Sequence, residues 1–487
     1  MADQYIEEII KKGDDGSDIL HDICKHTHSF RKEVVDVDSS TGGLTGLRLT
    51  KNNKVAVHSS GGDPSIGDVS EYVASLVDRL VEQSHDIGAK PIAMTNIIDM
   101  PVIDLDVIKT AGKALYEQTK KHKVAIINGE LAGLGYECVA SPLNISGTMI
   151  SAIDSSHVNG IYEKGVLAEF ECAVFDHENK LIFANSDGIG TKILIYQLLE
   201  DTYTAKNTMG LQDTIAMDAD DAGKKGAVIK LIALTTETRS KTNLEDILRT
   251  KANELARKVG IESIMHVEHL GKRINGYGDS PYNLNATTVS LIDDATLKNP
   301  PVPKPGDYIL AIRDPEHLGF RSNGITKLRQ GLAKVFGENW HKEKFWDKNV
   351  AELAAVPSTV FYPVFRELWQ KKLATSFYHM SGGAHNGKLA RPLAKHNLYA
   401  ELHNVFKPTA LMQLLVDQMG ITPEDAYAMW NMGNEAYITT KSPTQAARVL
   451  HKYGLESIVA GVVQAAENNK TGITINLPLK QIYYSGR

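Results

Sequence analysis

The sequence has few cysteines, no long apolar run and no block of basic residues. Its cysteines, Cys24, Cys138 and Cys172, lie far apart and lack the CxxC spacing of a zinc site. They indicate a reducing compartment rather than a disulfide framework. No apolar stretch approaches the roughly 18 residues that a bilayer-spanning helix needs, and the charged N-terminal segment MADQYIEEIIKKGDDG has no apolar core like that of a signal peptide. We therefore expect a cytoplasmic protein without a membrane partner.

Charge and length narrow the class further. The formal net charge is −6, which argues against nucleic acid as the main partner. The 487 residues suffice for about two to four domains. Because 42% hydrophobic and 23% charged residues are ordinary for a globular protein, composition alone selects no function. The function has to be sought in the motifs.

The segment FANSDGIGTK, residues 183–192, is the first candidate for chemistry. An apolar strand at 181–184 ends in a loop that holds Asp187, two glycines, Thr191 and Lys192. A carboxylate can hold Mg²⁺, glycines let backbone N–H groups approach a ligand, and a lysine neutralises phosphate charge. The spacing is neither that of a P-loop nor that of a dinucleotide fingerprint. The alternative is a β-turn in which the aspartate caps its own backbone.

The segments around this motif predict an α/β fold that contains an internal repeat. In the first half, strands are expected at 54–58, 90–98, 124–127 and 143–153, and helices at 68–86 and 104–122. In the second half, strands are expected at 181–184, 227–234, 264–267 and 285–292, and helices from residue 210 onward and at 243–259. The alternative is coincidence, because strands and helices alternate in any α/β protein.

The two ends of the chain complete the organisation. Two short helices are expected within the first 30 residues, the first carrying Tyr5 and Ile9 and the second carrying Ile19 and Ile23. The Pro-rich stretch LKNPPVPKPG, residues 297–306, predicts a linker. In the last segment, strands are expected at 308–312, 435–439 and 458–463, and helices at 325–336, 364–369, 388–393 and 443–451. Glycine loops at 318–324, 379–384 and 429–434 lie beside these elements, where free backbone amides can bind an anion.

Taken in order, the motifs resemble those of the phosphoribosylformylglycinamidine cyclo-ligase (aminoimidazole ribonucleotide synthase) family and its superfamily. The family's D-G-x-G-T-K is intact at 187–192, and its A-M-x-x-N-D resembles AMDADD at 216–221. H-S-N-G resembles RSNG at 321–324, and P-T-x-x-Y resembles the segment 357–362. H-I-T-G-G-G resembles HMSGGA at 379–384, and F-N-M-G resembles WNMG at 430–433. Each match is weak alone, but the ordered set is specific.

The departures from the family pattern indicate that the motifs of a single site are distributed over two halves of the chain. The family's G-G-E-T-A-E is missing from the half that carries D-G-x-G-T-K, and its nearest likeness is NGELAG at 128–133 in the other half. That other half lacks D-G-x-G-T-K and carries Asp78-Arg79 where the family has an Asn-Asp pair. An arginine there would repel a magnesium ion. We therefore expect each half to have lost what the other half kept.

The resemblance implies an α/β fold with two tandem N-terminal-type synthase domains that form an intrachain pseudo-dimer barrel, followed by one C-terminal synthase domain. The expected domains are an N-terminal helical extension (1–40), a degenerate N-terminal-type domain (41–160), a nucleotide-binding N-terminal-type domain (161–296) and the C-terminal domain (307–487). Because the pairing is within one chain, the usual dimer becomes unnecessary, and a monomer or a homodimer is expected.

The implied reaction is the ATP-dependent cyclisation of formylglycinamidine ribonucleotide to aminoimidazole ribonucleotide in purine biosynthesis, with ATP, Mg²⁺ and a phosphoribosyl intermediate as ligands. The implied metal ligands are Asp187, Asp220, Asp221 and Glu130. The implied nucleotide contacts are Asp187, Gly188, Gly190, Thr191, Lys192 and Glu130, and Lys192 is also a catalytic candidate. The implied contacts to the substrate phosphate are Ser322, Asn323, Gly324, Ser381, Gly382 and Gly383.

Several alternatives stay open at this point. His379 is a candidate acid/base, because histidine titrates near neutral pH, or it caps the end of a strand. Glu130 is a metal ligand or a solvated loop carboxylate. The chain is a cyclo-ligase, another ATP-dependent superfamily enzyme (an amidotransferase-like synthetase or a small-molecule kinase), or a non-catalytic nucleotide-binding paralogue.

Overall fold

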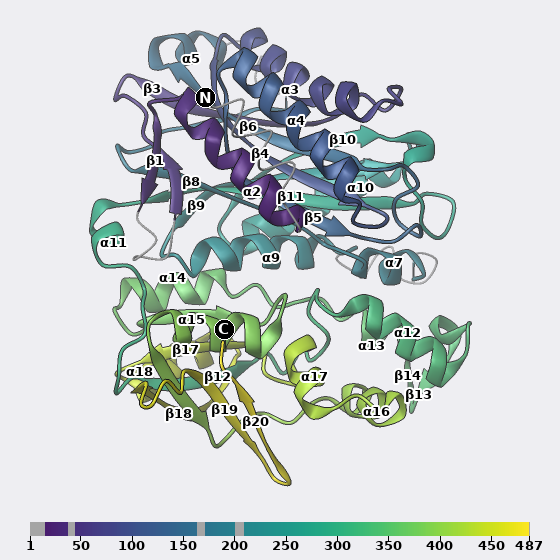
Figure 1. Ribbon diagram of the computed structural model, residues 1–487, viewed down its shortest axis with the longest axis vertical. Helices are drawn as coiled ribbons and strands as arrows, with labels where there is room; N and C mark the ends of the chain where they lie inside the picture. The colour runs from purple at the N-terminus through teal and green to yellow at the C-terminus, as the bar shows by residue number, and fades with distance from the viewer. Residues whose placement is uncertain (1–14, 38–43, 163–170, 200–208, 487) are drawn as a thin grey trace. The chain divides into compact units, whose positions relative to one another are not determined.

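The computed structural model describes residues 15–37, 44–162, 171–199 and 209–486. The first expected helix, with Tyr5 and Ile9, lies outside these residues. The chain divides into two compact units (Figure 1). The N-terminal unit comprises Met1–Ile189 and Ala227–Asn299, and the C-terminal unit comprises Gly190–Gly226 and Pro300–Arg487. In the described ranges, no helix has the length and hydropathy to cross a membrane.

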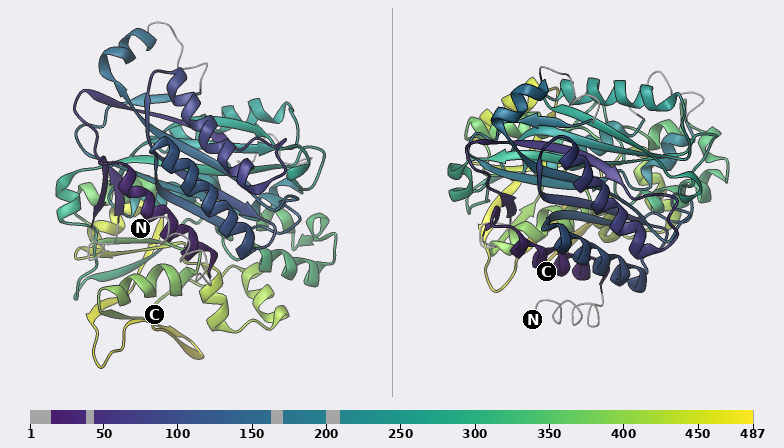
Figure 2. Two further views of the ribbon diagram at one scale, coloured as in Figure 1. Left: turned by 45° about the horizontal axis from the view of Figure 1, so that its top comes forward. Right: turned by 90° about the horizontal axis from the view of Figure 1, so that it is seen from above.

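The first sheet of the N-terminal unit has the strand order β5-β4-β6-β3-β7. Its strands are β3 (Asn53–Gly61), β4 (Lys90–Met100), β5 (Ala125–Gly133), β6 (Asn144–Asp154) and β7 (Ala173–Phe175). The helices of this part are α2 (Gly16–Thr27), η1 (His28–Phe30), α3 (Val69–Asp86), α4 (Leu105–His122) and α5 (Ser155–Tyr162). The apolar faces of α2, α3 and α4 share one buried core with β4 and β6, and α3 and α4 lie side by side in both figures (Figure 2).

The second sheet of this unit has the order β1-β2-β8-β11-β9-β10. Its strands are β1 (Val34–Val37), β2 (Leu44–Leu47), β8 (Leu181–Gly188), β9 (Val228–Thr238), β10 (Glu262–His269) and β11 (Tyr282–Ile292). The helices of this part are α10 (Leu244–Lys258), η3 (Gly271–Arg273) and α11 (Asp294–Lys298). The strand β2 pairs with both β1 and β8.

The two sheets repeat one topology. The orders β5-β4-β6-β3 and β10-β9-β11-β8 place consecutive strands identically, with one parallel pair (β4 with β5, β9 with β10) and antiparallel pairs elsewhere. The sheets face each other across a shared apolar core that includes Val57, Ile150, Leu231 and Val289. The expected α/β class, with two similar halves packed within one chain, is confirmed. The domain boundaries stay predictions.

One expected loop is instead part of a strand. Residues 128–133 were expected to form a glycine-rich loop, but they continue β5, where Asn128, Gly129 and Glu130 pair with Thr95, Asn96 and Ile97 of β4. A Cβ on Gly129 would lie 2.8 Å from the Asn96 side-chain oxygen. The glycine therefore permits close strand pairing rather than a turn.

The C-terminal unit is built on a seven-stranded sheet with the order β15-β17-β12-β18-β16-β19-β20. Its strands are β12 (Tyr308–Arg313), β15 (Ser376–His379), β16 (Leu398–Leu402), β17 (Ala436–Thr440), β18 (Glu456–Ala465), β19 (Gly472–Leu477) and β20 (Lys480–Tyr484), and β13 (Lys344–Phe345) pairs separately with β14 (Lys348–Asn349). The helices are α7 (Lys192–Gln197), α9 (Leu211–Gly223), α12 (Ile325–Phe336), η4 (Trp340–Lys342), α13 (Val350–Ala354), α14 (Tyr362–Gln370), η5 (His385–Ala390), α15 (Arg391–Lys395), α16 (Ala410–Met419), α17 (Pro423–Met429) and α18 (Pro443–Lys452).

The core of this unit lies between the sheet and two helices. Phe365 and Leu368 of α14 pack with Val449 of α18 against Leu310 and Ile438 of the sheet. The helix expected at 388–393 is a π-helix, η5, followed by the short α-helix α15. This local geometry places Lys388 close to the end of α9, as described below.

Candidate functional site

The end of β8 meets the middle of β5 in the N-terminal unit, and each strand carries one of the predicted carboxylates. Asp187 is the penultimate residue of β8, and its Oδ1 accepts a hydrogen bond from the Gly188 amide (2.8 Å). The neighbouring Ser186 amide donates to Asn128 Oδ1 of β5 (2.9 Å), two residues before Glu130. The structure therefore joins the strand segments that carry Asp187 and Glu130, although they belong to different sheets. Both carboxylates are half-buried.

The corresponding strand end of the other half is closed by an ion pair. Arg79 of α3 donates to Glu268 of β10 (2.8 Å), and the same carboxylate oxygen accepts from the Gly61 amide at the end of β3 (3.3 Å). His266 lies 3.1 Å from it. Burial opposes ionisation of Glu268, but hydrogen bonding to His266 and the charge of Arg79 hold its pKa below the usual value. The arginine thus pairs with the carboxylate at this strand end.

A second acidic group, which the motifs did not indicate, lies between the sheets. Asn283 of β11 donates to both Asp99 of β4 (2.9 Å) and Glu237 of β9 (3.1 Å), and Asn285 also donates to Asp99 (3.2 Å). Burial, and then the nearby Asp99 charge, raises the pKa of Glu237 to about 8, and burial raises the pKa of Asp99 to about 6. In the sequence, the only sign of this acidic pair is that Asp99 and Glu237 each follow closely after an expected strand, at 90–98 and 227–234.

In the C-terminal unit, Lys192 is fully buried at the start of α7. Its ammonium donates to Asp213 Oδ1 (2.8 Å) and to the carbonyls of Phe320 and Val356 (2.7 Å each). Burial lowers the pKa of Lys192, whereas Asp213 keeps a lowered pKa because Lys192 and several hydroxyl donors outweigh its burial. The three protein acceptors use all three donors, so a phosphate contact would require Lys192 to leave them. That predicted contact stays a prediction.

The acidic pair at the end of α9 is held by protein cations. Asp220 accepts from Arg321 (3.1 Å) and from the Tyr362 amide (2.8 Å), and all three groups are buried. Asp221 accepts from His379 (2.5 Å) and is paired with Lys224. Burial opposes ionisation of Asp221, but the cations around it, Lys224 first, hold its pKa well below the usual value.

These pairings decide how well the predicted metal ligands fit Mg²⁺. In the described part of the chain, no group of three or more His, Cys, Asp or Glu side chains has a geometry that could hold a metal ion. Asp220 and Asp221 face ammonium, guanidinium and imidazole groups, which a magnesium ion would have to displace. Their arrangement does not fit a magnesium site.

The predicted substrate-phosphate loops form ordered turns in the C-terminal unit. Ser322 Oγ donates to Asp213 (3.1 Å), Asn323 donates to the Met429 carbonyl, and Gly324 has a φ of +65° just before α12. A Cβ on Gly324 would lie 2.7 Å from Trp430 Nε1, so this turn requires glycine.

The second loop follows β15. Ser381 Oγ lies 3.3 Å from His379 Nε2, whereas Gly382 and Gly383 are exposed, and Gly383 has a φ of +76°. His379 therefore connects the loop to Asp221, which is a richer role than capping the strand. Whether any of these residues binds a substrate stays a prediction.

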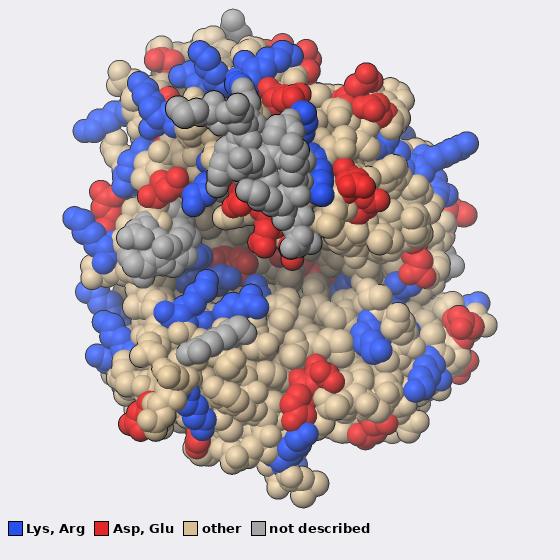
Figure 3. Space-filling model, in the orientation of Figure 1, with Lys and Arg blue, Asp and Glu red and all other residues tan. Residues whose placement is uncertain are grey.

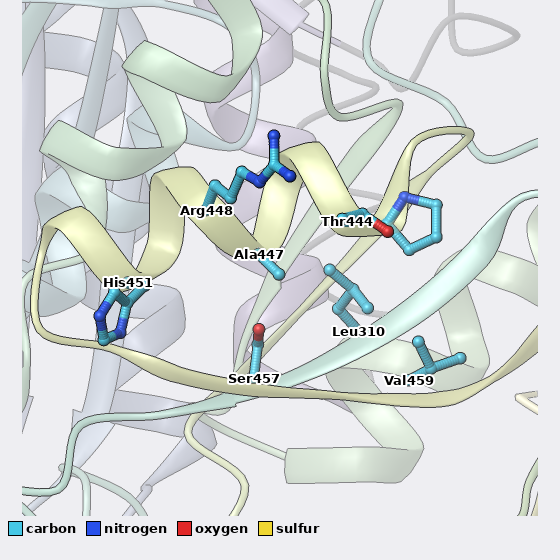
Figure 4. A pocket seen from close by; sticks show the side chains of 8 residues that line it. Leu310, Thr444, Ala447, Arg448, His451, Ser457 and Val459 are labelled. Atoms are coloured by element: carbon cyan, nitrogen blue, oxygen red, sulfur yellow. The ribbon is translucent and has the colours of Figure 1, made fainter.

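One surface pocket of the C-terminal unit lies away from these loops. It is lined by residues of β12, α18 and β18, among them Leu310, Arg448, His451 and Val459 (Figure 4). Figure 4 shows Arg448 and His451 on the helix and Leu310 and Val459 on the strands below it. No predicted site residue lines it, so it is not the candidate site.

Known proteins of similar sequence carry the name of the family that the motifs resemble. No protein-family model matches the sequence. Similar curated proteins include the phosphoribosylformylglycinamidine cyclo-ligase of Limosilactobacillus reuteri (strain DSM 20016), 26% identical over 336 residues, which cover 65% of this chain and 88% of the relative. The enzyme of the same name from Pyrococcus horikoshii is 24% identical over 331 residues, covering 65% and 90%.

Thiamine-monophosphate kinase from Stenotrophomonas maltophilia K279a has 14% identity and a TM-score of 0.45, covering 63% of this chain and 88% of that chain. The hydrogenase maturation protein HypE in complex with ATP has 14% identity and a TM-score of 0.42, covering 62% and 84%. The sequence relatives support a place in the superfamily of the cyclo-ligases. They leave the particular family and reaction open.

Proposed function

We propose that the chain is an ATP-dependent enzyme of this superfamily and that it closes the ring of formylglycinamidine ribonucleotide to give aminoimidazole ribonucleotide. The observation that carries the proposal is the hydrogen bond between Ser186 and Asn128, which joins the strand segments that carry Asp187 and Glu130. The cyclo-ligase relatives and the ordered motifs support the same reaction. One composite site would then draw on both halves of the N-terminal unit.

The proposed roles follow from the donors and acceptors of each residue. ATP would supply a phosphoryl group that turns the amide oxygen of the substrate into a good leaving group. Asp187 and Glu130 would hold Mg²⁺ with the nucleotide, and Gly188, Gly190 and Thr191 would offer N–H and hydroxyl donors to phosphate oxygens.

The remaining residues would position the substrate or hold a proton. His379 would hold a proton at Nε2, between Asp221 and the Ser381 hydroxyl. Lys192 would donate a hydrogen bond to the Phe320 carbonyl and so hold the loop that carries Ser322 in position. The protein would act mainly by positioning and by neutralising charge.

The test is the rate of ADP formation from Mg·ATP with and without formylglycinamidine ribonucleotide. We expect turnover that depends on the ribonucleotide, and its loss in Asp187→Asn. Asp176→Asn is the matched control, because Asp176 is an exposed turn residue just before the same strand. Growth of a purine auxotroph that lacks the cyclo-ligase gives a second readout. Soluble wild-type protein that neither turns over the substrate nor rescues growth would rule out the cyclo-ligase assignment.

A second candidate function is a different ATP-dependent reaction of the superfamily. The observation that favours it is the Arg321–Asp220 pair, in which both members depart from the family motifs and bind each other in a buried position. His379 Nδ1 lies 3.6 Å from the same Asp220 carboxylate, so the pair borders the proposed acid/base residue. ADP formation with another phosphorylated acceptor, and none with the formylglycinamidine ribonucleotide, would select this candidate. Binding of Mg·ATP without any turnover would favour a non-catalytic paralogue.

A further inference from the structure

The pocket between α18 and the strands β12 and β18 has no role in the proposed function. Its volume is about 520 Å³, and small-molecule sites typically measure about 300–1,000 Å³. The residues that line it all lie in the range Pro300–Arg487, so the pocket is complete within the C-terminal unit. It is therefore large enough for a small organic ligand.

The floor of the pocket is apolar. Leu310 of β12 lies directly opposite Val459 of β18, so both side chains are on the same face of the sheet. α18 covers this face with Val449 and Leu450, which share a buried core with Leu310. Figure 4 shows the short side chain of Ala447 pointing from the helix toward Leu310. Because Ala447 is small, it leaves space above the strands, and Val459 stays 44% exposed.

The polar groups of the pocket come from the helix and from one strand. Arg448 and His451 are exposed and lie on one side of α18, one helical turn apart. In the part of the chain that the structure describes, neither side chain has a hydrogen bond or an ion pair. Figure 4 shows the Ser457 hydroxyl pointing toward the helix and the Arg448 guanidinium extended away from Leu310. An exposed, unpaired arginine can turn its guanidinium over the mouth of the pocket.

The rim of the pocket is positively charged. Of the described residues that line it, none is acidic. Glu456 precedes Ser457 in β18, but it pairs with Arg313 (2.6 Å), and strand alternation places its side chain on the opposite face of the sheet. Figure 3 shows lysine and arginine side chains along the edge of the C-terminal unit where α14 and α18 lie in Figure 1. Although the net charge of the chain is −6, this pocket favours an anionic group.

We propose that this pocket binds a small organic carboxylate with an apolar body. The guanidinium of Arg448 matches a planar carboxylate through two parallel N–H···O bonds, and His451 adds a ring N–H donor. The apolar body lies on Leu310, Ala447 and Val459. One guanidinium balances one negative charge, so the pocket fits a monocarboxylate better than a phosphate dianion. This site is independent of the proposed reaction.

The probes are 3-phenylpropionate, 3-phenylpropanol and 3-phenylpropylamine, which share one apolar body and differ in the charge of the head group. Each is titrated calorimetrically into the full-length protein. We expect the carboxylate to bind about tenfold more tightly than the alcohol, as expected for a charge-assisted hydrogen bond, and the ammonium to bind most weakly. Arg448→Gln should remove this advantage of the carboxylate and leave the binding of the alcohol unchanged. Lys480→Gln is the matched control, because it removes an exposed cation from β20, another strand of the same sheet.

A second variant, Ala447→Leu, fills the pocket while keeping a residue that favours helix. It should abolish the binding of all three probes, and a thermal melt checks that each variant is folded. Three results would each overturn the proposal: wild-type protein that does not bind 3-phenylpropionate, equal affinities for the three head groups, or unchanged binding in folded Ala447→Leu. An equal loss of carboxylate binding in Arg448→Gln and Lys480→Gln would also overturn it, because the effect would then come from net charge and not from this pocket.

Discussion

The buried pair of Lys192 and Asp213 joins three segments of the C-terminal unit through one ammonium group. Asp213 also accepts from Ser358 Oγ (2.6 Å) and Tyr196 OH (2.6 Å), so the lysine is the cation of a larger network. Breaking one partner of a buried pair leaves the other charge uncompensated. Lys192→Met should therefore lower the free energy of unfolding by about 3–5 kcal/mol, measured by urea denaturation.

The matched control for this substitution is Lys371→Met. Lys371 forms an exposed pair with Glu367 (2.7 Å) in the same unit, and exposed pairs contribute only about 0–1 kcal/mol. If both variants lost the same small amount of stability, the buried network would contribute no more than a surface pair. Lys192 would then be free to change partners during binding, as the phosphate contact requires.

The Asp99–Glu237 pair makes stability depend on pH. Both carboxyl groups have raised pKa values, about 6 and about 8, chiefly because of burial. The folded state therefore holds protons that the unfolded state has released, and stability falls as pH rises through these values. We expect the melting temperature to fall between about pH 6 and pH 8, and Glu237→Gln to flatten that fall because it keeps the hydrogen-bonding shape without the charge.

Glu254→Gln is the control for the pH profile, because Glu254 is an exposed residue of α10 in the same unit. Its profile should follow that of the wild type. A wild-type melting temperature that rises steadily from pH 6 to pH 8 would contradict a raised pKa at this pair. The measurement is a thermal melt, followed by circular dichroism, in buffers of equal ionic strength.

At the scale of elements, local signals predicted some helices, such as α3, α4 and α12, but not α16 or α17. α12 begins and ends at the residues that the apolar period predicts. Asp68 and Asp104, the first residues of two expected helices, are the N-caps of α3 and α4. The ends of strands were harder to predict. β5, for example, continues through the glycine-rich residues 128–133, a pattern that is typical of a loop. Its extension depends on pairing with β4, a distant contact that no local pattern contains.

The same limit applies to the site. Asp187 and the segment of Glu130 stand out because motifs mark them. Arg79 and Glu268 are 189 residues apart in sequence, and nothing local links them. The lysines near Asp221 look like an ordinary solvated helix end until η5 brings Lys388 beside them. Pairings of this kind need the tertiary fold.

The cap of α4 offers a direct test at this scale. Asp104 Oδ1 accepts from the amides of Asp106 (2.9 Å) and Val107 (3.2 Å), which otherwise have no acceptor within the helix. Asp104→Ala should cost about 1 kcal/mol of unfolding free energy, and Asp104→Asn, which keeps the acceptor oxygen, only a few tenths. Equal losses in the two variants, measured by urea denaturation, would show that the charge rather than the capping oxygen matters.

At the scale of the whole molecule, the repeated topology creates two equivalent strand ends, at β8 and β3, which carry different side chains. The end of β8 presents Asp187 beside the β5 segment of Glu130. The end of β3 carries Gly61. The Gly61 amide and the Arg79 guanidinium both donate hydrogen bonds to the Glu268 carboxylate. Asp78, the neighbour of Arg79, is turned toward His122 and Lys121 of α4 instead. One half has thus kept an acidic end, and the other has replaced it with an internal ion pair.

This asymmetry predicts one nucleotide per chain. Calorimetric titration of a non-hydrolysable ATP analogue with Mg²⁺ should give a stoichiometry close to one, and Asp187→Asn should abolish the binding heat because the acidic end is lost. Arg79→Ala should leave the stoichiometry unchanged, since removing the arginine exposes Glu268 without restoring an aspartate at the end of β3, where Ser60 stands. Two nucleotides bound per wild-type chain would contradict this prediction. So would a single site that survives Asp187→Asn and is lost in Arg79→Ala, because the nucleotide would then bind at the end of β3 and not at the end of β8. Sedimentation at the same concentration, with 53.4 kDa for a single chain, would show whether the stoichiometry refers to a monomer or to a homodimer.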